Sequence, residues 1–435
     1  GRNGVDQYPG AQRVPIPHPK LKHGDRCPCC AKGAVYLQPP GNILRIKGRS
    51  LLEAKVYQPE RYRCGLCGEV YWAELPPEAG EEIYDESAGS ILALLKYGSG
   101  MPFYRMEKLQ EGFGVPLPDS TQWDIVKEVG ERVEAAYLFL VYLAAQGEVF
   151  HNDDTGMTIL ELPPDPDHPA DRTGTFTSGI VVQAGEHTIA LFFTGRKHAG
   201  ERLNEVLQQR EPQAPPPIQM SDALSRNVPK GAATREANCN AHGRRNFVKI
   251  VESFPEACRR VLTDLRAVYR NEAETKAQQM TSEERLRFHQ KRSKPILDGL
   301  KQWMEKQLED KRVEPNSGLG KAISYMLNHW EKLTLFLREP GAPLDNNICE
   351  RALKMAILHR KNALFYKTEN GAAVGDLFMS LIHTCRLNGA DPFDYLTELQ
   401  KHREEVQATP ERWMPWNYRA TLERLMASTV GPPVT

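Results

Sequence analysis

The chain has 435 residues, of which 40% are hydrophobic, and its Lys plus Arg and its Asp plus Glu residues are equal in number, at 56 each. This length exceeds what one ordinary core accommodates and predicts roughly two to four domains. Because the formal net charge is zero, any binding of nucleic acid must depend on local basic patches and not on an overall basic character. No segment approaches the ~20 apolar residues of a membrane span, and the first 20 residues lack the apolar core of a signal peptide. We therefore expect a cytoplasmic protein with no membrane partner. The chain opens on Gly, which leaves open that natural N-terminal residues are missing.

Five of the nine cysteines fall within the first 67 residues. They include two C-x-x-C pairs separated by strand-like sequence, which is the spacing of a zinc ribbon with one structural Zn²⁺ held by four thiolates. The predicted ligands are Cys27, Cys30, Cys64 and Cys67. A disulfide knot is the alternative, but it needs an oxidising compartment that nothing in the sequence supports. Cys258 and Cys385 lie among apolar helical residues and are predicted to be core thiols.

Helices are predicted across residues 79–145. Within them, MEKLQEGFGVPLPDSTQWDIVKEV has the order of a helix, a turn that contains glycine, and a second helix with Asp119 or Ser120 at its N-cap. The apolar stripe of the second helix is Trp123, Val126 and Val129. The pattern fits a DNA-binding helix-turn-helix and an ordinary packed pair of helices about equally well.

From residue 147 the pattern becomes that of strands, with GEVFHND, MTILEL, TFTSGIVVQAG and HTIALFFTG as three or four consecutive antiparallel strands. Asp153 and Asp154 stand at the end of the first of them. An amphipathic helix over 198–210 and a strand that ends in Asp222 follow. ANCNAHGRRNFVKIV then predicts a short strand that enters a helix, and a long helical insertion comes next. The segment PLDNNICERALKMAILHRKN begins a new helix with Glu350 in its first turns.

Two strand-end aspartates followed by a helix glutamate occur in this order in ribonuclease-H-like DDE nucleotidyl transferases. Such carboxylates can converge on two Mg²⁺ ions about 3.5–4 Å apart, and hard oxygen ligands suit Mg²⁺. Asp153 is the predicted ligand, and Asp154 is its neighbour or a reserve. The predicted fold is multidomain α+β. Its parts are an N-terminal segment with a zinc ribbon (1–78), a helical DNA-binding region (79–145), a ribonuclease-H-like α/β catalytic core (146–255 and 340–400) interrupted by a helical insertion (256–339), and a C-terminal tail (401–435).

The last third of the chain carries several sequence motifs in combination. Asn-Asn precedes Glu350, Arg-Lys-Asn follows it by ten residues, and NGADPFDYL and WMPWNY come later. NCNAHGRRNF contains a Cys-x-x-His-x-Arg-Arg block, and KYGSGMPFYRMEKL lies in the predicted helical region. With these motifs the chain resembles the transposases of the insertion sequence 66 family over nearly its whole length, and the ribbon stands where that family carries one.

The resemblance implies a role for each matching residue. HNDDT falls on the family's His-Ala-Asp-Glu-Thr, so Asp153 would be the first catalytic acid and Asp154 the variable residue after it. Asp222 in QMSDAL falls on the second catalytic acid, and Glu350 falls on the third. The ALSRN that follows Asp222 differs from the Gly-Tyr usual there. The implied activity is Mg²⁺-dependent cleavage and strand transfer at the ends of a mobile element, with double-stranded DNA as partner, a homo-oligomer, most simply a dimer, on that DNA, and small accessory proteins of the same element. The implied location is the bacterial nucleoid.

Basic residues near these acids are candidate DNA contacts. They are His242, Arg244 and Arg245 in the Cys-x-x-His block, and Lys354, Arg360 and Lys361 in the acid-free run after Glu350. His242 could also be a core histidine, and the run after Glu350 could be a solvated helix face.

Three other functions fit the sequence less well. A non-catalytic DNA-binding regulator derived from a transposase would not need all three acids, which are present here. A zinc hydrolase built on His151, Asp153 and His242 lacks an H-E-x-x-H helix or a comparable compact ligand set. A nucleotide-driven enzyme would need a phosphate-binding loop, which GLGKA at 318–322 resembles. However, Pro315 stands where such a loop needs its first Gly, and Ala322 stands where it needs Ser or Thr, so GLGKA predicts a helix start instead.

Overall fold

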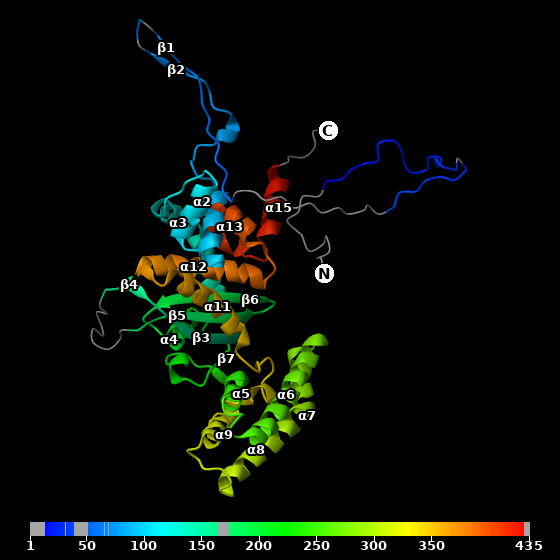
Figure 1. Ribbon diagram of the computed structural model, residues 1–435, viewed down its shortest axis with the longest axis vertical. Helices are drawn as coiled ribbons and strands as arrows, with labels where there is room; N and C mark the ends of the chain where they lie inside the picture. Colours follow the sequence, from blue (N-terminus) through cyan, green and yellow to red (C-terminus); the bar gives the residue numbers. More distant parts are fainter. Residues whose placement is uncertain are drawn as a thin grey trace. The chain divides into compact units, whose positions relative to one another are not determined.

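The computed structural model describes residues 14–30, 32–38, 51–64, 66–67, 69–163 and 174–429. The chain forms two compact units, residues 1–51 and 52–435. In the first unit, Arg26 and Ala34 form an antiparallel bridge on either side of a C-x-x-C turn. The second unit contains the helices and strands labelled in Figure 1 and has the mixed α+β composition predicted from the sequence.

The second unit begins with a hairpin of β1 (Arg61–Arg63) and β2 (Val70–Trp72), then η2 (Pro77–Ala79) and a group of helices. These helices are α1 (Glu86–Ala93), η3 (Leu94–Gly98), α2 (Phe103–Gly112) and α3 (Asp119–Ala145). The predicted N-cap of α3 is wrong by one residue or more, because Pro118 occupies the cap position and Asp119 is already helical. The carbonyl of Pro118 accepts the first helical hydrogen bond, from the amide of Gln122 at 3.0 Å. The fixed φ of proline suits the chain's entry into a helix, so a polar cap is not needed here.

A five-stranded sheet forms the centre of the second unit, with the order β6-β5-β3-β7-β8. The strands are β3 (Val149–Met157), β5 (Thr175–Ala184), β6 (His187–Gly195), β7 (Ile218–Ser221) and β8 (Arg235–Asn238). β3, β5 and β6 are antiparallel neighbours, whereas β7 and β8 run parallel to β3. Of the three or four antiparallel strands predicted, three form. The second predicted segment, MTILEL, becomes β4 (Ile159–Glu161), which lies outside this sheet and pairs in parallel with β9 (Tyr366–Thr368).

Helices cover the sheet on both faces and along one edge. α4 (Ala199–Leu207) and α11 (Asn347–Ala363) both contact β3 and β5. α12 (Glu369–Leu387) lies along β6, the outer strand (Figure 1). The amides of Thr188, Ala190, Phe192 and Thr194 donate to the side chains of Asn388, Thr384, Ser380 and Asp376, respectively, at 3.3, 3.0, 2.9 and 2.5 Å. Four helical residues advance about 6.0 Å and two strand residues about 6.8 Å, so polar side chains at every fourth position of the helix can follow every second amide of the strand.

The segment between α5 (Asn240–Val248) and α11, called the insertion below, is helical, as predicted for residues 256–339. Its elements are α6 (Pro255–Ala277), α7 (Ser282–Arg292), α8 (Lys294–Glu309), α9 (Gly318–Asn328), α10 (Trp330–Leu333) and η5 (Leu335–Leu337). The predicted helix start at GLGKA is confirmed, because α9 begins at Gly318 and the Ser317 side chain caps it. The insertion packs with β7, β8 and α5 into one core, and the helices and strands around β3, β5 and β6 form another. The side-chain amide of Asn240 donates to the carbonyls of Leu333 (2.8 Å) and Leu344 (3.1 Å), which ties the start of the insertion to its end.

The C-terminal part consists of α13 (Pro392–Lys401), α14 (Arg403–Ala408), η6 (Pro410–Arg412) and α15 (Tyr418–Thr429). Trp413, from the predicted WMPWNY motif, is fully buried and accepts a hydrogen bond at its carbonyl from the Tyr395 hydroxyl. Cys258 and Cys385 are buried in the two cores, which confirms the prediction that they are core thiols. None of the helices in the described part of the chain combines the length and the apolar character that a bilayer crossing requires.

Candidate active site

The two adjacent aspartates of β3 lie on opposite faces of the sheet, because side chains alternate along a strand. Asp153 is paired with Gly179 of β5, and directly paired residues share a face. A Cβ atom on Gly179 would lie against Leu353 of α11, so this face, and Asp153 with it, is covered by α11. Asp154 is paired with Ser178 and lies on the face covered by α4.

Asp154 is held by two basic side chains on that face. Its Oδ2 lies 2.8 Å from Nδ1 of His198, the residue before α4, and its Oδ1 lies 3.4 Å from Nη2 of Arg226. The Asp154 side chain is only 2% exposed. The second aspartate of the HNDDT motif is thus occupied in tying β3 to α4 and to η4 (Ser225–Asn227).

Gly179 allows α11 to approach the sheet closely. A Cβ atom at this position would lie 2.9 Å from Cδ2 and 3.0 Å from Cγ of Leu353, closer than packed carbons approach one another. The Cys349 thiol, one residue before Glu350, donates to the Gly179 carbonyl at 3.3 Å. The missing side chain of one strand residue therefore sets the depth at which α11 presents Glu350 beside Asp153.

Asn346 fixes the beginning of α11 to β3. Its side-chain Nδ2 donates to the Asn152 carbonyl at 3.1 Å, and its Oδ1 lies 3.1 Å from Nδ1 of His151. Burial lowers the pKa of His151 to about 4, although the bond to Asn346 opposes this shift, so the imidazole is neutral at pH 7. A neutral ring can still donate from Nδ1 to the Asn346 oxygen. Asn346 thus bonds to the two residues that directly precede Asp153 in β3.

Asp222 follows β7, next to β3 in the sheet, and is connected to Asp153 through Asn227. The Asn227 amide nitrogen donates to Asp222 Oδ1 at 2.6 Å and lies 3.5 Å from Asp153 Oδ1. Asn227 is itself buried, and its carbonyl accepts from the side chains of Asn152 and Gln219, both at 2.7 Å. One buried amide thus holds the first two predicted acids toward a common point.

The electrostatics of Asp153 reflect three neighbouring carboxylates. Burial is the largest cause that raises its pKa, to about 7, and the negative charges of Asp222, Asp154 and Glu350 raise it further. The amide of Asp154, which donates to Asp153 Oδ1 at 2.8 Å, partly offsets these effects. The structure therefore brings Asp153, Asp222 and Glu350, which are far apart in the sequence, within electrostatic reach of one another.

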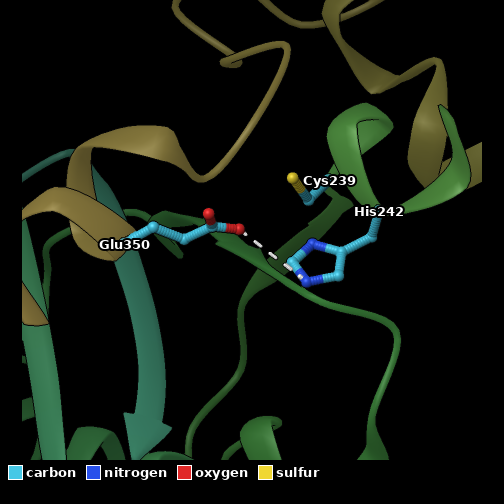
Figure 2. Close-up of side chains that lie close together, drawn as sticks. All are labelled: Cys239, His242 and Glu350. Carbon is cyan, nitrogen blue, oxygen red and sulfur yellow. Dashed lines mark ion pairs between the residues drawn. The ribbon is translucent and has the colours of Figure 1, made fainter. Parts of the chain in front are cut away.

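Glu350 also faces the start of α5, as Figure 2 shows. Its Oε1 lies 3.8 Å from Nε2 of His242 and 3.5 Å from Nη2 of Arg245. Cys239, the residue before α5, lies beside this pair, and burial raises the pKa of its thiol to about 11. The Cys-x-x-His-x-Arg-Arg block thus meets the third predicted acid directly.

The other predicted DNA contacts differ in their exposure to solvent and in their hydrogen bonds. Arg244, Lys354 and Lys361 are exposed. The Arg360 guanidinium instead bonds to the Thr155 hydroxyl at 3.1 Å and to the Gly156 carbonyl, both near the end of β3. Arg360 therefore joins the C-terminal half of α11 to the strand that carries Asp153.

The predicted zinc ligands fall in both units. In the first unit, the amides of Gly33 and Lys32 and the side chain of Cys27 lower the pKa of the Cys30 thiol. In the second, the amide of Cys64 donates to the Glu69 carbonyl at 2.8 Å, in the turn between β1 and β2. Among the described residues, Cys27, Cys30 and Cys67 form no disulfide. A single Zn²⁺ held by both pairs stays a prediction.

Sequence comparison identifies the family to which this site belongs. The family model described as Transposase IS66 family matches residues 82–374. The chain belongs to the IS66 transposase family. This membership confirms the resemblance drawn from the motifs and supports a transposase-related function. The IS66 match includes the three acids and Asn227, whereas the four ribbon cysteines precede it.

Three relatives from Sinorhizobium fredii show how far the similarity extends. The uncharacterized protein y4jD is 28% identical over 419 residues, which cover 91% of this chain and 78% of y4jD. The uncharacterized protein y4qI is 26% identical over 342 residues, which cover 76% of this chain and 62% of y4qI. The uncharacterized protein y4hP is 32% identical over 206 residues, which cover 45% of this chain and 36% of y4hP. Similarity to y4jD therefore continues beyond the IS66 match at one or both of its ends.

Proposed function

We propose that the protein is a DDE-type DNA transposase that binds the ends of an insertion sequence and catalyses Mg²⁺-dependent strand cleavage and strand transfer. Asp153, Asp222 and Glu350 are the proposed catalytic acids. The observation that carries the proposal is their convergence from β3, the end of β7 and α11, together with the raised pKa of Asp153. The mixed sheet, in which two parallel strands follow an antiparallel three-stranded half, supports a ribonuclease-H-like catalytic core.

The three carboxylates fit a pair of Mg²⁺ ions as ligands. They offer hard oxygen donors, which Mg²⁺ prefers. Burial is the main cause that raises the pKa of Asp153, and the negative charges of Asp222 and Glu350 raise it further. Bound cations would remove this repulsion between the carboxylates. When bound, two Mg²⁺ ions would activate the attacking oxygen and neutralise charge on the leaving oxygen at phosphorus.

The other side chains of the site orient these ligands. Asn227 directs one oxygen of Asp222 toward Asp153, and Asn346 fixes the start of α11 relative to β3. Arg245 balances the charge of Glu350 in the absence of cations. Since its guanidinium is half exposed, it can turn to a DNA phosphate when the carboxylate is otherwise neutralised.

DNA would approach along the exposed basic residues around the carboxylates. Arg244 and Arg245 lie on α5, and Lys354 and Lys361 lie on α11 after Glu350. These four residues would contact phosphates and position the scissile bond without reading sequence. Recognition of the element ends would come from the zinc ribbon and from α2 and α3. We further propose a dimer on DNA, because two ends must be brought together, and small accessory proteins of the same element as partners.

Four variants test this function in one experiment. Cleavage of labelled DNA that carries the element ends is measured in Mg²⁺, with a gel-shift assay of the same DNA. Asp153→Asn, Asp222→Asn and Glu350→Gln should each lower the cleavage rate at least about 100-fold and leave binding nearly unchanged, since the phosphate contacts remain.

Asp154→Asn is the matched control for the three acids. It removes a carboxylate one residue from Asp153, but on the face bound to His198 and Arg226. It should therefore lower thermal stability while cleavage per folded molecule stays within a few-fold of the parent. A dead Asp154→Asn beside an active Asp222→Asn would show that the acids are assigned wrongly. A parent that binds the ends and never cuts them would favour a non-catalytic regulator.

A further inference from the structure

The block that faces Glu350 contains ligands of a different chemical type from the three acids. Cys239, His242 and Glu350 offer a sulfur, a ring nitrogen and a carboxylate oxygen that lie within 4.8 Å of one another (Figure 2). Mg²⁺ does not favour sulfur or imidazole, whereas Zn²⁺ binds all three donor types. We propose that these three residues form a binding site for a thiophilic divalent cation, Zn²⁺, and that its occupation withdraws Glu350 from the catalytic carboxylates. The regulatory half of this proposal rests on the proposed function, but the binding half does not.

The distances are close to those of a tetrahedral zinc centre. Zn–S bonds of about 2.3 Å and Zn–N or Zn–O bonds of about 2.0–2.2 Å place neighbouring ligand atoms roughly 3.3–3.6 Å apart. The carboxylate of Glu350 and Nε2 of His242 are already 3.8 Å apart. Since the three ligand atoms lie within 4.8 Å of one another, the contraction needed is at most about 1.5 Å. Side-chain rotations can supply it because His242 and Glu350 are both partly exposed. Water would complete the fourth position.

The local fold favours a chelating pair at the start of α5. Cys239 is the N-cap residue and His242 lies in the first turn, so the C-x-x-H spacing brings the two side chains to the same end of the helix. The amide of Asn346 donates to the Cys239 sulfur at 3.2 Å, and the amides of His242 and Ala241 also hydrogen-bond to this sulfur. Amide donors of this kind orient a thiolate ligand and stabilise its charge on a metal. One nitrogen of His242, Nδ1, is buried and makes no hydrogen bond within the described part of the chain.

The proposed ion would compete with catalysis for one carboxylate. Glu350 can face Asp153 and Asp222, or it can turn its oxygens to the cysteine and histidine of α5. Zn²⁺ bound on the α5 side would hold Glu350 in the second arrangement. Excess Zn²⁺ should therefore inhibit cleavage even when Mg²⁺ is abundant, and loss of Cys239 should relieve the inhibition.

Binding is tested with Cd²⁺, a thiophilic probe whose bonds to thiolate absorb in the ultraviolet. The full chain is titrated beside Cys239→Ser, His242→Ala and the control Cys258→Ala, which removes a buried thiol from α6. The ribbon cysteines contribute equally to all four proteins, so the differences between the proteins report the substituted residues. We expect Cys239→Ser to bind one Cd²⁺ fewer than the parent, His242→Ala to bind that ion at least about tenfold more weakly, and Cys258→Ala to match the parent.

Two outcomes of the titration would overturn the site. Equal Cd²⁺ uptake by the parent and Cys239→Ser would show that the sulfur binds no metal. Loss of the ion in Cys239→Ser with unchanged affinity in His242→Ala would show a lone reactive thiol instead of a site.

Regulation is tested separately by adding Zn²⁺ to the Mg²⁺-dependent cleavage assay. Each protein is compared with its own rate in Mg²⁺ alone, so any effect of the substitution on that rate cancels. The Zn²⁺ concentration for half-inhibition should rise at least about tenfold in Cys239→Ser and stay unchanged in Cys258→Ala. Equal sensitivity of Cys239→Ser and the parent would refute the regulatory role. If the parent never cuts DNA, the proposed function fails, and the Cd²⁺ titration still decides whether the metal site exists.

Discussion

Gly179→Ala probes the contact that seats the glutamate-bearing helix on the sheet. The added Cβ would lie 2.9 Å from Cδ2 and 3.0 Å from Cγ of Leu353, so α11 or the Leu353 side chain must move. Overpacking of this kind costs about 1–3 kcal/mol, partly offset by about 0.4–1 kcal/mol because alanine restricts the unfolded chain. We expect a net loss of about 1–2 kcal/mol in the free energy of unfolding, measured by urea denaturation. The cleavage rate per folded molecule should also fall, because the displaced helix carries Glu350.

Two further variants separate this steric explanation from a general effect of alanine. Gly299→Ala in α8 adds the same methyl group where no atom beyond its chain neighbours and the nearby backbone of the helix lies within 4 Å, so it should be neutral or stabilising. Leu353→Ala alone should cost about 2–5 kcal/mol as a cavity, but the double variant with Gly179→Ala should cost less than the sum by at least about 0.5 kcal/mol. Full additivity, or a Gly179→Ala protein as stable as the parent, would refute the close-packing argument.

Three other predictions concern separate parts of the molecule. Burial raises the pKa of Asp376 to about 7, despite two hydrogen bonds from Thr194 that oppose the shift, so this folded-state value lies above the unfolded value of about 3.9. Stability should therefore fall as pH rises from about 4 to about 7 and Asp376→Asn should flatten that slope, whereas identical urea midpoints across pH in both proteins would contradict the assignment. Lys361→Ala should lower the slope of log binding constant against log salt by about 0.9, measured with DNA of unrelated sequence, whereas Arg360→Ala should chiefly lower thermal stability. An unchanged slope in Lys361→Ala would exclude a phosphate contact at that residue. Metal analysis of the purified protein should find zinc that is lost when the four ribbon cysteines are changed to Ser, and a protein without zinc would rule the ribbon site out.

The sequence was sufficient for features that depend on neighbouring residues. β-rich runs bounded by turn residues located β3, β5 and β6. The prediction that Asp153 stands at the end of its strand was wrong, because β3 continues to Met157 through its pairing with β5. The distinction between Asp153 and Asp154 needed the sheet, because only the paired residues of β5 and the helices beyond them show which face carries the acids. The sequence could not decide whether β4 joins the antiparallel strands, because its partner β9 lies some 200 residues away in the sequence.

Residues that act across long sequence separations were the ones missed. Asn227 lies in ALSRN, which seemed only a departure from a family motif, yet its amide joins the first two acids. The Asn-Asn before Glu350 marked the family, but the bond from Asn346 to β3 depends on a strand nearly 200 residues earlier. Gly179 gave no signal at all, because a glycine within a strand acquires meaning only when the helix above it is known.

The row of hydrogen bonds from the β6 amides to the polar side chains along α12 has a consequence for synthesis on the ribosome. The helix residues that accept from the β6 amides are made long after the strand itself, with Asn388 emerging roughly 190 residues after Gly195. At about 5–20 residues per second, the edge of β6 stays uncovered for roughly 10–40 s. During that time its apolar sequence and unpaired amides can pair with another nascent chain, as exposed strand edges do. The risk of aggregation therefore depends on the order in which the segments are translated. A chaperone that binds the incomplete sheet would protect it until α12 is synthesised and packs against β6.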